Sequence, residues 1–189
     1  PGHGTAPSGL VHIRAEDMIA ATRLGMTHLH DRLGNKPVHM LGYSTGAALA
    51  LDFALDAMAG DAKPVPASLV LISPAIRVSN AAALASFQDG LSVLPGMDRM
   101  AWLDLLPEYD PYKYNSFATN AADVVHRLTT GVDGRIAKRV RANKGFILPP
   151  TLVFKSAVDA TVTTEAVVDN LLTLLPPYRH ELVRSEEHT

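Results

Sequence analysis

The stretch VHMLGYSTGAALALDFALDAMA, residues 38–59, decides the fold. A four-residue apolar run of strand length, 38–41, leads into the pentapeptide Gly42-Tyr43-Ser44-Thr45-Gly46, and an alanine-rich stretch of helical length follows. The pentapeptide is a GxSxG, and a strand–turn–helix is the setting in which that motif presents a reactive serine. The alternative is a glycine-rich turn between a strand and a helix with an idle serine.

The residues around Ser44 have a physical reason for their types. A serine at the tip of so sharp a turn takes a strained backbone conformation, which costs about 1–3 kcal/mol. We expect side chains two residues before and two residues after it to clash, which explains Gly42 and Gly46. The helix that follows would direct its dipole and the N–H of Thr45 toward an oxyanion formed when the serine attacks.

Further apolar runs and helical stretches alternate along the chain. Strands are predicted over 69–72, 151–154 and 181–183, and helices over 14–33, 45–59 and 163–175. Gly34 and the proline after it predict the end of the first helix. Strands that alternate with helices indicate an α/β protein with a parallel, doubly wound sheet.

Residues 77–146 break this alternation and contain no convincing buried strand. We predict that they form a helical cap inserted between two core parts, 1–76 and 147–183. Open α/β sheets bind ligands at the carboxyl ends of their strands, which is where such a cap would lie. Its apolar residues, Trp102 among them, either line an acyl pocket or pack the cap against itself.

Composition excludes several classes of protein. The 189 residues include 17 Lys and Arg against 19 Asp and Glu, a net charge of −2, and no cysteine. This balance argues against nucleic-acid binding, and no apolar run reaches the roughly 18 residues of a membrane span. His28 and His30 would face different ways on one helix, and no other histidines suggest chelation, so we expect no metal and no cofactor. We expect a cytoplasmic protein, and the oligomeric state stays open.

The opening residues Pro1-Gly2-His3-Gly4-Thr5-Ala6-Pro7-Ser8, then a helix, then the run 38–46, resemble the α/β-hydrolase superfamily. Within it the chain is similar to the serine esterase and monoacylglycerol-lipase-like branch. The resemblance implies a partial α/β-hydrolase fold in which the four apolar runs are strands five to eight. It also implies Ser44 as nucleophile, Thr45 N–H as one oxyanion donor, and an acyl ester, with lipid-like esters included, as the small-molecule substrate.

The same resemblance suggests the other site residues. The family's acid lies in the loop after strand seven, which corresponds to Asp159; the alternative is a turn or helix-capping aspartate. Asp123 and Asp133 fall in the predicted cap and are worse placed. His3 resembles a loop histidine near the pocket floor, and Tyr43 and Trp102 are further pocket candidates.

The catalytic histidine is the missing member. The family order Ser, Asp, His places it after strand eight, beyond the end of this chain. His180 stands at the start of that strand, the end opposite the active site, where a surface role is simpler than a role as base. The second oxyanion donor, from the loop after strand three, would precede Pro1.

Both ends suggest a fragment. Residues 184–189, RSEEHT, can be back-translated as AGATCGGAAGAGCACACG, which resembles the start of a widely used DNA-sequencing adapter. We interpret them as a non-native tail after Val183; the alternative is an ordinary polar terminus. The parent protein is thus expected to be a carboxylic ester hydrolase, and the fragment alone to be inactive. A peptidase, thioesterase or acyltransferase on the same fold, or a silent ligand-binding module, are the alternatives.

Overall fold

The computed structural model describes residues 6–76, 101–107, 109, 115–142, 148–156, 164–175 and 179–185. They belong to two compact units. The smaller comprises residues 1–18 and 78–127, and the larger comprises residues 19–77 and 128–189.

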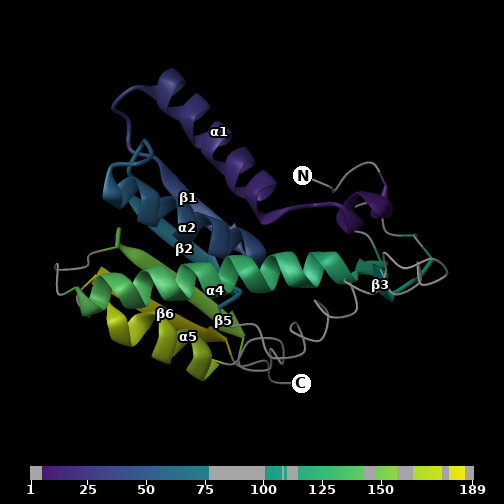
Figure 1. Cartoon of the computed structure of the whole chain (residues 1–189). Coiled ribbons are helices and arrows are strands. Elements are labelled where there is room, and N and C mark those ends of the chain that lie inside the picture. The colour runs from purple at the N-terminus through teal and green to yellow at the C-terminus, as the bar shows by residue number, and fades with distance from the viewer. Residues whose placement is uncertain are drawn as a thin grey trace. The chain divides into compact units, whose positions relative to one another are not determined.

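A four-stranded parallel sheet, in the order β1-β2-β5-β6, forms the centre of the larger unit (Figure 1). The strands are β1 (His39–Tyr43), β2 (Ser68–Ile72), β5 (Thr151–Ser156) and β6 (His180–Ser185). Each of the four apolar runs of the sequence is therefore a strand, and the predicted parallel α/β sheet is confirmed. Tyr43 pairs with Ile72 and Ile72 with Phe154, so the carboxyl ends of these strands meet at one edge.

Helix α2 (Thr45–Ala59) packs its small side chains against the sheet. Ala47, Ala50 and Ala54 are fully buried in a core cluster that includes Leu71 of β2 and Val153 of β5. Alanines leave the helix close to the strands, because no long side chain stands between them. This close packing fixes the start of α2, and with it the turn that contains Ser44.

Of the two other predicted helices, one ends where the sequence predicted and one ends earlier. Helix α1 (Ala15–Leu33) ends at Gly34, whose φ of 59° is the left-handed value expected after a helix. The helix predicted over 163–175 is shorter than expected: α5 (Thr164–Asn170) gives way to a 3-10 turn, η3 (Leu172–Leu174).

The smaller unit includes two short antiparallel strands, β3 (Trp102–Asp104) and β4 (Phe117–Ala118), and the 3-10 turn η1 (Pro7–Val11). The sequence predicts neither strand, because two or three residues are too few to show a hydrophobic period. The Asn120 side-chain amide donates to the carbonyls of Leu10 at 3.1 Å and Ile13 at 2.8 Å. These bonds attach η1 and the segment that follows it to the residues after β4.

Helix α4 (Thr119–Arg141) contributes to both units, so the unit boundary differs from the predicted cap of 77–146. Residues 128–141 belong to the larger unit, because Val132 and Ile136 are buried in its core cluster. Among the described residues, no helix combines the length and the hydrophobicity needed to cross a bilayer.

Candidate active site

Ser44 stands alone between the last residue of β1 and the first residue of α2, with φ 51° and ψ −118°. Positive φ is rare for a residue with a side chain and costs energy, so this turn is strained. The Ser44 N–H donates to the carbonyl of Ile72 at 2.9 Å. Its own carbonyl accepts the N–H of Ala47 at 3.0 Å and that of Ala75 at 3.2 Å. Hydrogen bonds on both sides hold the serine in its strained conformation.

Gly42 explains why the turn requires a glycine before the serine. A Cβ at this position would lie 2.5 Å from the Ala47 Cα and 2.5 Å from the Gly46 carbonyl oxygen. Backbone atoms cannot yield to such a contact. The clash expected at Gly46 does not occur, since an added Cβ there has no described atom within 4 Å. Gly46 already lies in the first turn of α2, and its side-chain position faces open space.

The two residues beside Ser44 differ in what they offer a ligand. Thr45 opens α2, so its N–H is one of the first amides of a helix, which have no acceptor within the helix. Tyr43 ends β1 with 67% of its surface exposed. Ser44 itself is half-buried. A half-buried hydroxyl beside an open helix N-terminus can meet both a substrate and the amide that stabilises an oxyanion.

His180 lies at the opposite edge of the sheet from Ser44. It pairs with Thr151, and Thr151 with Leu69, at the amino ends of the strands. That level is four residues before Ser44, roughly 13 Å along the strands, and three strands across. A hydrogen bond to the serine needs about 3 Å. His180 therefore cannot be the base for Ser44.

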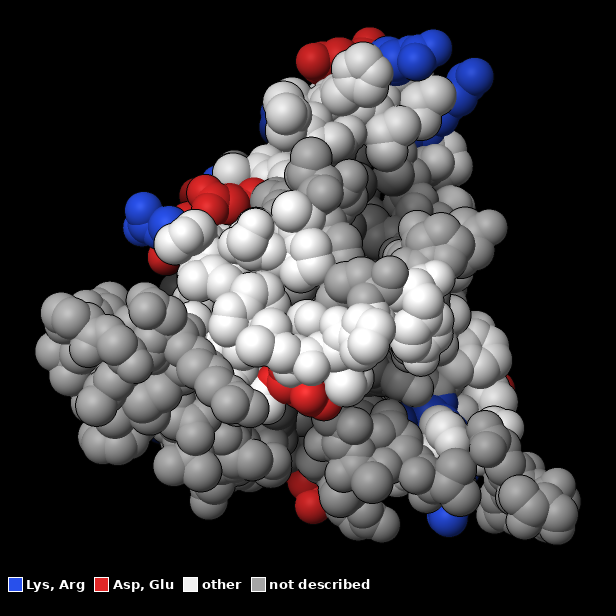
Figure 2. Space-filling view, turned by 90° about the vertical axis from the view of Figure 1, so that its right-hand side faces the viewer, with Lys and Arg blue, Asp and Glu red and all other residues white. Residues whose placement is uncertain are grey.

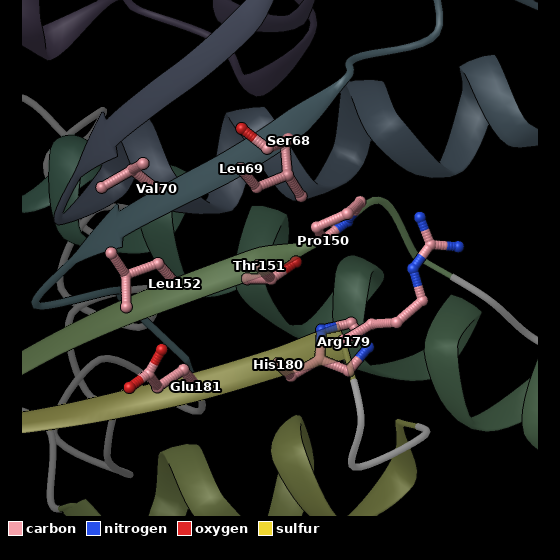
Figure 3. Close-up of a pocket in the computed structure, with 9 residues that line it drawn as sticks. All are labelled: Ser68, Leu69, Val70, Pro150, Thr151, Leu152, Arg179, His180 and Glu181. Carbon is pink, nitrogen blue, oxygen red and sulfur yellow. The ribbon is translucent and has the colours of Figure 1, made fainter.

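A hollow of about 590 Å³ lies at this amino edge, lined by Ser68, Thr151 and His180 with six neighbours (Figure 3). Both ring nitrogens of His180 are buried and have no hydrogen-bond partner among the described residues. Burial, and then the positive charge of Arg179, lower the pKa of the His180 imidazole. The hollow is distant from Ser44 and is not part of the candidate active site.

For several predicted site residues, the described part of the structure shows no contact with Ser44. His3 and Asp159 lie outside the described residues. Trp102 is half-buried in β3 and belongs to the smaller unit. Asp123, considered and set aside as an acid, pairs with Arg127 in that unit, with Nε and Oδ2 2.6 Å apart.

One charged cluster behind the site was not predicted from the sequence. Asp52 and Asp56, one turn apart on α2, are 7% and 6% exposed. Arg135 of α4 bonds both carboxylates, and Arg23 of α1 bonds Asp56 as well. Burial raises the pKa of the Asp52 carboxyl although Arg135 opposes the shift. Acidic residues four apart on an alanine-rich helix were the available signal, but their partners are distant in sequence.

The histidines, aspartates and glutamates of the described residues form no group of three that could hold a metal ion. The geometry around Ser44 combines a strained serine, a glycine that lets strand and helix touch, and a helix N-terminus. A family model described as the alpha/beta hydrolase family matches residues 1–185. The chain belongs to the alpha/beta hydrolase family.

Solved structures share this hydrolase fold at low sequence identity. A metagenome-derived lipolytic enzyme superposes with a TM-score of 0.70 at 19% identity, covering 98% of this chain and 69% of its own. The Paleococcus ferrophilus monoacylglycerol lipase superposes with a TM-score of 0.60 at 14% identity, and the match covers 93% of this chain and 66% of that enzyme. A soluble variant of the Saccharomyces cerevisiae monoglyceride lipase also has a TM-score of 0.60, at 12% identity, and the match covers 98% of this chain and 66% of that enzyme.

These hydrolase structures are longer than the chain, which spans about two thirds of their length: 69%, 66% and 66%. No curated protein matches the sequence. At such identities the likeness establishes the fold, and the parallel sheet of four strands is part of an α/β-hydrolase fold.

Proposed function

We propose that the protein carrying this chain hydrolyses carboxylic esters, with Ser44 as its nucleophile. The observation that carries the proposal is the backbone of Ser44, left-handed at the tip of the turn between β1 and α2. Strain of this kind persists only where surrounding contacts enforce it, and it is concentrated at functional sites. Membership of the alpha/beta hydrolase family also supports the proposal.

The reaction follows from the roles assigned to each group. The Ser44 Oγ attacks the ester carbonyl carbon while its proton passes to a histidine that Asp159 orients. The Thr45 N–H donates to the oxygen that becomes negative. The alcohol then leaves with the proton, and the acyl group stays on Ser44. Water then attacks the acyl carbonyl carbon in the same way, which releases the acid and restores the serine.

A lipid-like ester, such as a monoglyceride, is the proposed substrate. Support comes from the lipolytic enzyme and the monoacylglycerol lipases whose fold the chain shares. On the face drawn in Figure 2, the described Lys, Arg, Asp and Glu residues stand in small groups around uncharged residues. His3, Tyr43 and Trp102 stay pocket candidates, and a cytoplasmic location stays a prediction.

Covalent labelling tests the nucleophile. A fluorophosphonate probe is incubated with the protein expressed from its complete gene and with its Ser44→Ala variant, and the adduct is mapped by peptide mass spectrometry. We expect one adduct, on Ser44, which the variant lacks. Ser68 is the internal control, since its Oγ lies 2.7 Å from the His39 Nδ1 but outside any elbow. An adduct on Ser68 alone, or none, would reject Ser44 as nucleophile.

Substrate profiling separates ester hydrolysis from the other chemistries of the fold. Initial rates are measured on p-nitrophenyl esters of increasing acyl length, on acyl thioesters and on aminoacyl amides. The proposal expects kcat/KM to be highest on esters and to increase with acyl length. Higher values on amides or thioesters would indicate a peptidase or thioesterase. Ser44 labelling without turnover of any of them would favour a silent binding module.

A further inference from the structure

The residues after β2 hold the candidate nucleophile through its main chain. The Ser44 N–H donates to the Ile72 carbonyl at 2.9 Å, and the Ser44 carbonyl accepts the Ala75 N–H at 3.2 Å. Both backbone groups of the serine are thus bound by one four-residue segment, 72–75. The segment comes from a neighbouring strand, and helix α2 contributes a second donor to the same carbonyl, the Ala47 N–H at 3.0 Å.

The segment that binds Ser44 is itself fixed to the next strand. Ser73 follows β2 as Ser44 follows β1, and it too has a positive φ, 42°. Its N–H donates to the Phe154 carbonyl of β5 at 2.8 Å. Pro74 and Ala75 are buried. The donor at Ala75 therefore stands on a turn that a buried proline and a hydrogen bond to β5 hold in place.

The carbonyl of Ser44 and the N–H of Thr45 belong to the same peptide unit. A trans peptide is planar, and its C=O and N–H point in opposite directions. A donor that fixes the Ser44 carbonyl oxygen inside the protein therefore fixes the Thr45 N–H on the other side, outward from the turn. Accepting a hydrogen bond also polarises the unit, and such cooperativity strengthens the opposite donor by about 10–30%.

We propose that the Ala75 N–H is a positioning group for the oxyanion donor: through the Ser44–Thr45 peptide it orients and polarises the Thr45 N–H. The inference rests on the proposed function, since it gives a further role at the same site. It assigns to the loop after β2 a part in transition-state stabilisation that none of its side chains performs.

A matched control exists at the other end of the same strand pair. Ala67 also follows a proline, Pro66, and its N–H donates to the Val38 carbonyl at 2.8 Å, just before β1. An ester in place of the amide at residue 75, made by incorporating lactic acid, deletes the N–H and keeps the shape. The same change at residue 67 deletes an equivalent bond at the opposite edge. Ala75→Pro and Ala67→Pro form a second, genetically simpler pair.

The functional readout is the rate of Ser44 phosphonylation, because the phosphoryl oxygen occupies the position of the oxyanion. We expect the ester at residue 75 to lower the maximal labelling rate about tenfold with the probe's KI unchanged, less than the 10²–10³ for removing a whole donor. The kcat should fall by the same factor with KM unchanged. A purely structural role would lower the fraction of protein labelled and leave the rate of the remainder unchanged.

A second readout needs no activity. The ¹⁵N chemical shift of the Thr45 amide should move in the residue-75 ester and stay constant in the residue-67 ester. Equal labelling rates in the two esters, or an unmoved Thr45 resonance, would overturn the positioning role even if Ser44 is confirmed as nucleophile. Absence of Ser44 labelling in the unaltered protein would instead overturn the proposed function, and the inference with it.

Discussion

Gly42 and Ala47 are in such close approach that a Cβ on the glycine would lie 2.5 Å from the alanine Cα. The two residues belong to β1 and α2, and Ser44 lies in the turn between them. A strand and a helix that touch through backbone atoms leave the turn no room to relax. The strained conformation of the serine is thus a consequence of packing on both sides of it.

Adding a methyl group at this contact should damage the elbow. We expect Gly42→Ala to lower the free energy of unfolding by about 3 kcal/mol, the upper range for overpacking, because only backbone atoms face the new Cβ. Gly46→Ala is the control, with open space at its Cβ, and should change stability by less than about 1 kcal/mol. Urea unfolding followed by circular dichroism measures both. Equal losses in the two variants would show that the contact is not the cause.

The strain at Ser44 should be measurable as stability. Ser44→Gly removes the side chain that makes a φ of 51° costly, so we expect it to unfold at higher urea than Ser44→Ala, by about 1 kcal/mol. Ser44→Ala keeps the strain and serves as the reference. Neither variant should react with a fluorophosphonate. If the alanine variant proves as stable as the glycine variant, the serine backbone is not strained.

Arg135 should contribute more to stability than an ordinary surface arginine. It bonds both Asp52 and Asp56, which are almost fully buried, so Arg135→Ala leaves two carboxylates poorly compensated. We expect a loss of roughly 3 kcal/mol, the low end for buried pairs because 35% of the arginine side chain is exposed. The stability of Arg135→Lys should lie between those of the unaltered protein and Arg135→Ala, since one ammonium replaces a guanidinium that bonds two carboxylates.

A surface ion pair provides the reference for the Arg135 experiment. Arg14 and Glu16 are both 72% exposed, and their charged atoms lie 3.5 Å apart. Arg14→Ala should cost less than about 0.5 kcal/mol. Thermal unfolding of the three variants in parallel tests the ranking. An Arg135→Ala variant as stable as Arg14→Ala would contradict the role given to the buried cluster.

The half-buried His180 should make stability depend on pH. Burial and Arg179 lower the pKa of His180 below its ordinary 6.5, so the unfolded chain binds the proton more tightly than the folded one. The contribution of His180 is complete above pH 6.5. It is lost as pH falls from 6.5 through the lowered pKa.

Urea unfolding between pH 4.5 and 8 tests this, with His180→Gln as the variant that should flatten the curve over that window. Arg179→Gln removes the second cause and should narrow the window without abolishing it. A His180→Gln curve parallel to that of the unaltered chain throughout would refute the assignment.

Local patterns in the sequence predicted most of the sheet and the strand, turn and helix around Ser44. The four apolar runs are strands because consecutive apolar residues suit a parallel strand buried on both faces, and the helix over 45–59 has the predicted bounds. Strands of two or three residues, such as β3 and β4, leave no period to detect. The sequence also did not indicate that α4 is divided between two units, since Val132 and Ile136 are identified as core residues only by what they pack against.

The sequence by itself determined the parallel sheet, the position of Ser44 between a strand and a helix, and the need for a glycine at residue 42. These depend on neighbours within a few residues, whose spacing can be read directly. Only the tertiary structure decided that Ala75 donates to the Ser44 carbonyl, that Arg135 joins Asp52 to Asp56, and that His180 lies at the far edge from Ser44. The contacts among these join residues 31 to 83 positions apart. Which residues meet and which are kept apart depends on the packing of the helices and the order of the strands, which no local pattern encodes.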